Sequence, residues 1–271
     1  MEQTLYDLMD WAGIEELVYS EGNNPHGLLG PHLTDSGLLV QALIPTAQAI
    51  TVKITSTGRK YPMELADEAG FYAALIPRKS MAAYTLIVTY DNGSTEEIHD
   101  PYSYAPQYTD EDLKKFNAGI HYGIYEKMGA HPMTVKGVEG VYFSVWAPCA
   151  MRVSVVGDFN LWDGRRHPMH LLGDSGIFEL FIPGLKPGQI YKYEIKTKAG
   201  LPMLKADPYA NYAELRPDTA SVVWDIGRYQ WQDRDWMEKR AKDELFTGPV
   251  SIYEVHLGSW KRKEQIGRAH V

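Results

Sequence analysis

Cysteine is nearly absent from this sequence of 271 residues, which contains only Cys149. A single cysteine cannot form an intrachain disulfide, so we expect no disulfide framework. The segment from Met1 to Asp10 lacks the apolar core of a secretory signal peptide. No apolar run approaches the length of a membrane span. These absences predict a cytoplasmic protein that has no membrane partner.

Basic residues are too few to balance the acidic ones. The 27 Lys and Arg stand against 35 Asp and Glu, which gives a formal net charge of -8. This balance argues against a nucleic acid as the main partner and is compatible with a neutral ligand. Aromatic residues are plentiful, with 18 Tyr, 7 Trp and 7 Phe. Such rings either fill a β-rich core or present a flat apolar face to a sugar ring.

Motifs for catalysis and cofactor binding are also missing. The sequence has no nucleophile elbow, no phosphate-binding loop and no cluster of metal ligands. Ser175 lacks the strand–turn–helix context that a nucleophilic serine needs. The nine histidines are scattered, and the pair of most interest, His26 and His32, only flanks a Leu-Leu-Gly turn. We therefore predict no catalytic residue, no metal site and no cofactor.

An internal duplication is the strongest feature that is present. Four segments of the first half recur in the same order in the second half, at offsets of 103 to 107 residues. They are residues 37–45 with 140–148, 70–77 with 176–183, 84–93 with 191–200, and 100–102 with 207–209. A period this long indicates duplicated domains and not a solenoid of short repeats.

Each copy has the pattern of a β-sandwich. Residues 141–146 alternate with the period of two that is typical of a pleated strand, and Asp91-Asn-Gly93 favours a hairpin. Short strands at regular spacing over about a hundred residues predict a sandwich. The connectors favour helices: residues 5–17 have helical apolar spacing with a break at Gly13, Thr109-Asp-Glu-Asp112 can start a helix, and 230–245 form another.

One turn in the second copy could carry a ligand site. The strand that ends at Val156 is followed by Gly157-Asp-Phe-Asn-Leu-Trp-Asp-Gly164. Trp162 in this polar turn is either a plug folded back on the sheet or a displayed platform. Asp158 and Asn160 could then bond sugar hydroxyls. Lys192, on the strand 191–195, is either a surface lysine that lies along apolar neighbours or a further ligand contact.

These residues carry a resemblance to a known family. Gly157-Asp-Phe-Asn-Leu-Trp162, Tyr191-Lys-Tyr193 and Asp207-Pro-Tyr209 resemble the carbohydrate-binding family 48 module, which is an immunoglobulin-like sandwich. Five further segments resemble the bacterial 1,4-α-glucan (glycogen) branching enzymes, namely residues 28–32, 42–45, 125–132, Trp231 with Trp236, and 253–260. The resemblance covers residues 20 to 263 and implies a mainly β fold with two tandem immunoglobulin-like sandwiches, short helical connectors and one stray barrel strand.

The resemblance also implies a division of the chain. The expected parts are an N-terminal helical segment at 1–20, a first sandwich at 21–106, a linker at 107–128, a family 48-like sandwich at 129–226, a helical connector at 227–248, the first strand of a glycoside hydrolase family 13 (β/α)8 barrel at 249–263, and a tail outside the family at 264–271.

The family's activity is glycogen biosynthesis by glycosyl transfer: it cleaves an α-1,4-glucan and transfers the segment to a 6-hydroxyl, which creates an α-1,6 branch. This retaining chemistry needs two carboxylates, which lie at later barrel strands. We expect this chain to be a fragment that lacks them, is inactive alone, and has the missing catalytic barrel as a partner. The resemblance places Tyr253, Glu254 and His256 in the first barrel strand, where a structural role is favoured.

The resemblance implies an α-glucan of the glycogen or amylose type as ligand, with Trp162, Asn160, Asp158 and Lys192 as contacts. A second stacking tryptophan of related sensing modules would fall near residues 201–203 and is not there. We therefore expect binding no tighter than roughly millimolar. Two alternatives remain, a stand-alone glycogen-sensing module and a fragment of a debranching or trehalose-forming hydrolase. Neither fits the 253–260 motif after two modules.

The two copies differ where the ligand turn lies. Copy two has three more residues than copy one between the segments at 140 and 168, and that interval contains the Trp162 turn. Copy one has Ile54-Thr-Ser-Thr-Gly58 there and no tryptophan. We therefore expect copy one to be a scaffold and copy two to bind the sugar.

Overall fold

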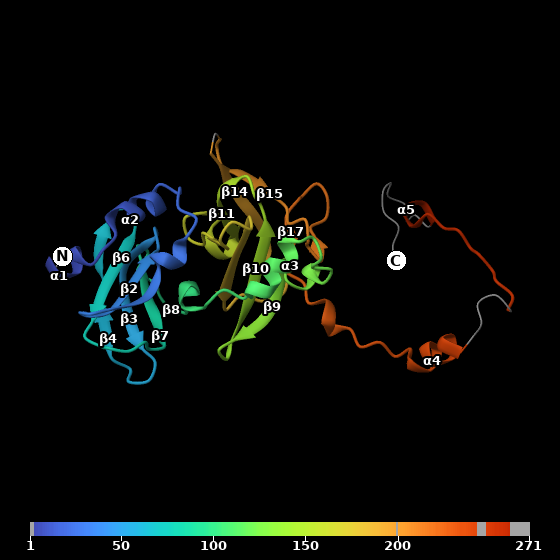
Figure 1. Ribbon diagram of the computed structural model, residues 1–271, viewed down its shortest axis with the longest axis horizontal. Coiled ribbons are helices and arrows are strands. Elements are labelled where there is room, and N and C mark those ends of the chain that lie inside the picture. The colour runs from blue at the N-terminus through green and yellow to red at the C-terminus, as the bar shows by residue number, and fades with distance from the viewer. Residues whose placement is uncertain (1–2, 199, 243–247, 261–271) are drawn as a thin grey trace. The chain divides into compact units, whose positions relative to one another are not determined.

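The structure, a computed structural model, describes residues 3–198, 200–242 and 248–260. The chain divides into two compact units, Met1–Ile226 and Gly227–Val271, and each is described by itself. The first unit contains two β-sandwiches, which are visible in Figure 1 as the blue-to-cyan and the green-to-orange halves. The mainly β fold with tandem sandwiches is therefore confirmed.

The first sandwich has two antiparallel sheets of four strands each. One sheet has the order β1 (Gly30–Thr34), β2 (Gly37–Leu43), β6 (Phe71–Ile76), β5 (Glu64–Asp67); the other has the order β4 (Lys60–Pro62), β3 (Ala47–Ile54), β7 (Tyr84–Tyr90), β8 (Thr95–Ile98). Leu38 and Val40 of β2 meet Val52 and Leu86 of the other sheet in one buried cluster. Alternation along the strands therefore creates the core between the sheets, as the period of two predicts.

The second sandwich repeats the strand order of the first sheet of copy one, and its other sheet has five strands. One sheet has the order β12 (His170–Leu171), β13 (Ile177–Pro183), β10 (Val138–Trp146), β9 (Gly129–Val135); the other has the order β11 (Ala150–Gly157), β14 (Ile190–Thr197), β17 (Ser221–Val222), β16 (Tyr212–Ala213), with β15 (Met203–Lys205) also on β14. Pro168 bridges Ser154 of β11, as Pro62 pairs with Thr51 of β3. The offset therefore grows by three residues across the Trp162 turn.

The duplication extends to single hydrogen bonds. In copy one the Tyr84 hydroxyl donates to Asp100 Oδ2 at 2.6 Å, and in copy two the Tyr191 hydroxyl donates to Asp207 Oδ2 at 2.5 Å. Both carboxylates also accept a backbone N–H two residues later. Burial raises the pKa of Asp100 to about 6 and also raises that of Asp207. Each Asp-Pro-Tyr segment thus anchors a loop against its own sandwich.

The helices before each sandwich cover one of its sheets. The helix α1 (Gln3–Asp7) contributes Leu5, and α2 (Trp11–Val18) contributes Ile14 and Leu17, to a buried cluster with Leu39 and Leu43 of β2. The two helices separate at residues 8–10, and not at Gly13 as predicted, because the Asp10 side chain caps α2 by accepting from the Gly13 N–H. Short 3₁₀ turns follow at Pro25–Gly27 and Pro101–Ser103.

The segment between the sandwiches packs in the same way onto copy two. Its helix α3 (Asp110–Asn117) begins at a capping box between Thr109 and Asp112, as the sequence predicts. A 3₁₀ turn follows at Ile124–Glu126. Tyr104 and Tyr108 are buried with Tyr142 of β10 in a cluster on the sheet's outer face. The expected linker is therefore a third layer of copy two.

The two sandwiches contact each other directly within the first unit. The Tyr102 hydroxyl donates to the Pro168 carbonyl at 3.0 Å, and the Leu171 N–H donates to the Asn23 carbonyl at 2.8 Å. His26 lies against the His170 ring, with 5.2 Å between centroids. Burial, followed by the charge of His170, lowers the pKa of His26 to about 4. Copy one is thus fixed to the end of copy two that carries the β11–β12 loop.

The second unit contains α4 (Arg234–Lys242), as predicted for 230–245, and α5 (Leu257–Trp260), after a 3₁₀ turn at Ile226–Arg228. The predicted barrel strand is not formed: residues 249–256 are neither helix nor strand, and Ile252 is 89% exposed. A strand needs a neighbour for its backbone groups, and no described segment pairs with this one. Residues 261–263 and the predicted tail at 264–271 lie outside the described residues.

Candidate functional site

The turn after β11 is built around Asn160, which is completely buried. Its Oδ1 accepts from the Gly157 N–H at 3.0 Å, and its Nδ2 donates to the Val155 carbonyl at 2.8 Å and to His167 Nδ1 at 2.9 Å. Burial lowers the pKa of His167 to about 3, so its ring remains a neutral acceptor near pH 7. Asn160 therefore closes the turn and has no amide group left for a sugar.

Trp162 is held in an unusual conformation beside this turn. Leu161 and Trp162 have φ values of 58° and 59°, in the left-handed region that costs a non-glycine residue about 1–3 kcal/mol. The Trp162 N–H donates to the Gly157 carbonyl at 3.0 Å, and its indole Nε1 donates to Asp158 Oδ1 at 2.8 Å. The ring is half-buried, and Asp158 is exposed. The indole is thus oriented by a carboxylate and not enclosed in the core.

Lys192 lies at the same end of the sheet. It pairs with Val156 across β11 and β14, one position from the pair Gly157 and Tyr191. Tyr191 is buried in the core, so the side chain of Lys192 is on the opposite, outer face. Its Nζ donates to Thr219 Oγ1 at 2.8 Å. The fold therefore places the turn with Trp162 and Asp158 at the same end of β11 and β14 as Lys192, which contacts Thr219.

An ion pair that the sequence did not reveal supports the other end of the loop. Arg152 is 3% exposed and pairs with Glu194 across the outer face of β11 and β14. Its Nη1 also donates to Ser154 Oγ and to the Gly164 carbonyl, both at 2.7 Å. A Cβ on Gly164 would lie 2.1 Å from Glu194 Oε1, so a larger residue there would displace the Glu194 carboxylate. Arg152 and Glu194 are 42 positions apart in the sequence, and the pairing of β11 with β14 brings them together.

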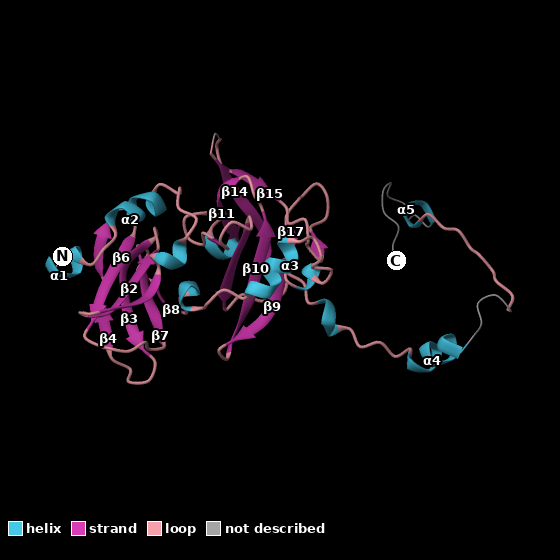
Figure 2. Cartoon of the chain, viewed as in Figure 1, coloured by secondary structure: helices cyan, strands magenta, loops and turns pink. Residues whose placement is uncertain are grey.

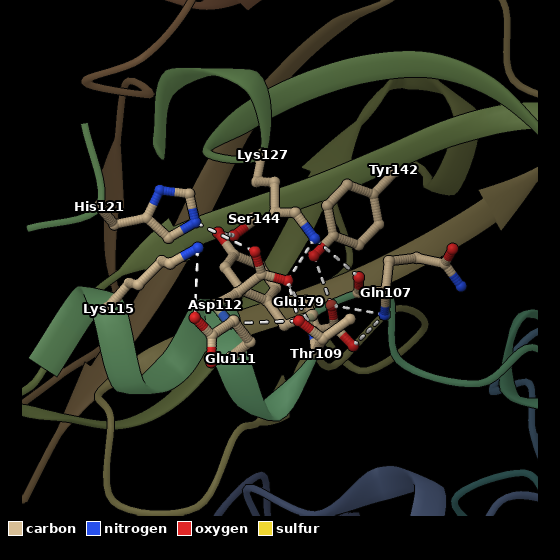
Figure 3. A network of polar contacts seen from close by, with 11 residues as sticks. Gln107, Thr109, Glu111, Asp112, Lys115, His121, Lys127, Tyr142, Ser144 and Glu179 are labelled. Atoms are coloured by element: carbon tan, nitrogen blue, oxygen red, sulfur yellow. Dashed lines mark hydrogen bonds and ion pairs between the residues drawn. The ribbon is translucent and has the colours of Figure 1, made fainter. Parts of the chain in front are cut away.

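The outer face of the other sheet is closed by the segment before copy two. Figure 3 shows Asp112 between Lys127 and His121, and Glu179 of β13 below Tyr142. Lys127 Nζ lies 2.7 Å from Asp112 Oδ2, and His121 Nε2 lies 3.1 Å from Asp112 Oδ1. Glu179 accepts from the Tyr142 hydroxyl and from the Gln107 N–H. Burial disfavours the charged form of both carboxyl groups. The hydrogen bonds from Lys127 and Thr109 outweigh this effect at Asp112 and hold its pKa well below the usual range. At Glu179 burial is the larger effect and raises the pKa. This network holds the segment before copy two against the outer face of the β10–β13 sheet.

The barrel-strand residues are not part of this site. Tyr253, Glu254 and His256 are exposed in the second unit. Tyr253 contacts the Trp260 ring edge-on at 5.3 Å, and His256 Nδ1 lies 2.8 Å from Ser259 Oγ. Within the described ranges, no group of three or more His, Cys, Asp or Glu could hold a metal ion. Among these same residues, no helix is both long and apolar enough to cross a membrane.

Two family models match the two copies in order. Residues 10–102 match the alpha-1,4-glucan branching enzyme GlgB N-terminal domain, and residues 127–210 match carbohydrate-binding module 48, the isoamylase N-terminal domain. The chain belongs to the GlgB family as an N-terminal region. The match to the GlgB N-terminal domain includes α2, which covers the first sandwich, whereas the carbohydrate-binding module match begins after α3.

GlgB relatives cover most of the chain. The 1,4-alpha-glucan branching enzyme GlgB of Thermosynechococcus vestitus is 46% identical over 252 residues, which are 91% of this chain and 33% of that protein. The GlgB of Paramagnetospirillum magneticum is 47% identical over 240 residues, which are 88% of this chain and 32% of that protein. The chain thus spans about a third of the length of these relatives. A pullulanase type I structure from Bacillus subtilis is 18% identical to this chain, with a TM-score of 0.32, and the match covers 74% of this chain and 27% of that chain.

Proposed function

We propose that this chain is the non-catalytic N-terminal region of a 1,4-α-glucan branching enzyme and that its second sandwich binds an α-glucan. The observation that carries the proposal is the polar turn that displays Trp162 beside Lys192 on a module of the carbohydrate-binding 48 family. The relatives' shared name supports branching as the activity of the whole protein. The cytoplasmic location expected from the sequence is part of this proposal.

Each group has a distinct role in the proposed site. The indole of Trp162 stacks on the C–H face of a glucose ring. A tryptophan ring suits this contact because its face is apolar and its edge carries a polar N–H group. Asp158 holds the indole by its Nε1–H and keeps its second carboxylate oxygen for a sugar hydroxyl. Lys192 and Thr219 offer a donor and a hydroxyl next to it. Asn160, expected as a ligand contact, is instead a positioning residue.

Copy one lacks the corresponding parts. Its β3–β4 connection consists of residues 55–59, which contain no aromatic residue. Its second sheet is in contact with copy two near Arg166, since Tyr90 lies close enough for Arg166 to affect its pKa. We therefore propose that copy one supports copy two and does not bind glucan itself.

Replacing Trp162 tests the proposal. We expect the chain to bind maltoheptaose with a Kd of roughly 1 mM, and Trp162→Ala to weaken binding about tenfold, as removal of a central aromatic contact does. Chemical-shift titration by NMR measures affinities in this range. Trp146→Ala is the matched control, because Trp146 is 53% exposed on β10 of the same module and donates to the Ser175 carbonyl. Equal affinities of the parent chain and of both variants would refute the proposed site.

A further inference from the structure

A second pair of aromatic rings lies on the sheet that carries the proposed site. Tyr212 of β16 and Trp224, just after β17, stack with 4.7 Å between ring centroids and 22° between planes. Tyr212 is 48% exposed, and Trp224 is half-buried. Both residues lie outside residues 127–210, which match the carbohydrate-binding module. The stacked geometry fixes the tilt of the Tyr212 ring, while its exposure leaves the ring accessible.

The strand register puts this pair on the same face as Lys192. Tyr191 pairs with Ser221, and both are buried towards the core. Their neighbours Ile190 and Val222 also pair, so both point to the outer face with Lys192. Val222 in turn pairs with Tyr212, which therefore lies on that outer face too.

The order of the strands also sets the distance across the sheet between Lys192 and Tyr212. β14, β17 and β16 are consecutive neighbours in the sheet, and β11 is on the other side of β14; Figure 2 shows β11, β14 and β17 in the same half of the first unit. Two strand spacings of about 4.8 Å separate Lys192 from Tyr212, roughly 10 Å across the sheet. Thr219, which bonds Lys192, lies on the segment leading into β17 between them.

We propose that Tyr212, held by Trp224, is a second stacking platform and that a longer α-glucan crosses the strands from Trp162 to Tyr212. This inference rests on the proposed glucan site and specifies its length. A single platform serves a short oligosaccharide, whereas two platforms on one rigid sheet engage one chain at two places, and the second contact is then intramolecular. The exposed segment 201–203 contributes no aromatic ring, so Tyr212 supplies the second ring from another strand.

The experiment compares two ligand lengths on two variants. NMR titrations use maltotriose and maltoheptaose with the full chain, Tyr212→Ala and Trp162→Ala. We expect Tyr212→Ala to weaken maltoheptaose binding about tenfold and to leave maltotriose binding unchanged, whereas Trp162→Ala weakens both. Tyr212→Phe retains the ring and should bind like the parent chain, which separates stacking from loss of fold. Tyr122→Ala, at an 86% exposed tyrosine before copy two, is the control.

The possible outcomes separate the two proposals. If Trp162→Ala weakens both ligands and Tyr212→Ala weakens neither, the glucan site stands and the second platform is wrong. The second platform is also wrong if Tyr212→Ala weakens maltotriose and maltoheptaose equally, because the contribution of Tyr212 would then not depend on ligand length. If the parent chain and Trp162→Ala have equal affinities, the proposed site is wrong, and the extension is wrong with it.

Discussion

Asn160→Ala should destabilise the second sandwich strongly, because one buried side chain satisfies three buried polar groups. The substitution removes the acceptor of the Gly157 N–H and the donors to the Val155 carbonyl and His167 Nδ1. An unsatisfied buried group costs about 1–3 kcal/mol. A water molecule in the space left by the amide can recover part of this cost. We therefore expect a loss of about 3–5 kcal/mol in the free energy of unfolding.

Urea unfolding followed by tryptophan fluorescence measures this loss. In a unit of the size of Met1–Ile226, 1 kcal/mol corresponds to about 2–4 °C, so a thermal melt should also shift down by about 10 °C. Asn117→Ala is the matched control, because Asn117 is exposed at the end of α3, and such surface changes stay within about 0.5 kcal/mol. A loss below about 1 kcal/mol for Asn160→Ala would show that this network does not hold the turn.

The same variant connects stability to the proposed site. The Trp162 N–H bonds the carbonyl of Gly157, whose own N–H bonds Asn160. Without Asn160, the left-handed backbone at Leu161 and Trp162 loses the surroundings that hold it. At a temperature where Asn160→Ala is still folded, we expect maltoheptaose affinity to fall as it does in Trp162→Ala. Unchanged affinity in the folded variant would remove the positioning role of Asn160.

Two further predictions concern the buried histidines and the branching activity of the isolated chain. Burial lowers the pKa of His26 to about 4 and that of His167 to about 3. Below about pH 6.5 these two histidines therefore take up protons in the unfolded chain but not in the folded chain. Their contribution reduces the free energy of unfolding as the pH falls from 7 to 5. NMR should show both rings neutral down to pH 5, and titration near 6.5 would contradict their burial. The isolated chain should leave the iodine colour of amylose unchanged, because no carboxylate pair is assigned in it; a shift that persists after further purification would show branching activity within these residues.

The duplicated fold was accessible from sequence because its determinants are local and repeated. The four matching segments became equivalent strands and loops, and the three-residue offset at the Trp162 turn appears in the pairing of Pro168 with Ser154. Alternating apolar residues define which strand face is buried. The residues before each sandwich were predicted only as connectors. Their role as covering layers was not predicted, because the packing of Tyr104 and Tyr108 on a distant strand leaves no local pattern in the sequence.

The site was predicted as a set of residues but not as an arrangement. Trp162, Asp158 and Lys192 do lie at one end of β11 and β14. In the sequence, the amide of Asn160 is as suitable for binding a sugar hydroxyl as any exposed amide. Only its burial shows that it bonds to the protein itself. Thr219, Arg152 and Glu194 are joined to the site by pairing between distant segments. The apolar run at 249–257 has the composition of a strand, but strand formation depends on a partner.

Sequence alone therefore determined what repeats and what alternates: two mainly β modules, a longer turn in copy two, and a tryptophan within that turn. Tertiary structure decided which polar groups remain accessible, because burial and hydrogen bonds depend on segments brought together from far apart in the chain. It shows that Asn160 positions the turn and does not contact a sugar, and it places Tyr212 and Trp224 on the face that carries Lys192. The register of three strands, β14, β17 and β16, determines this shared face, and no single segment contains it.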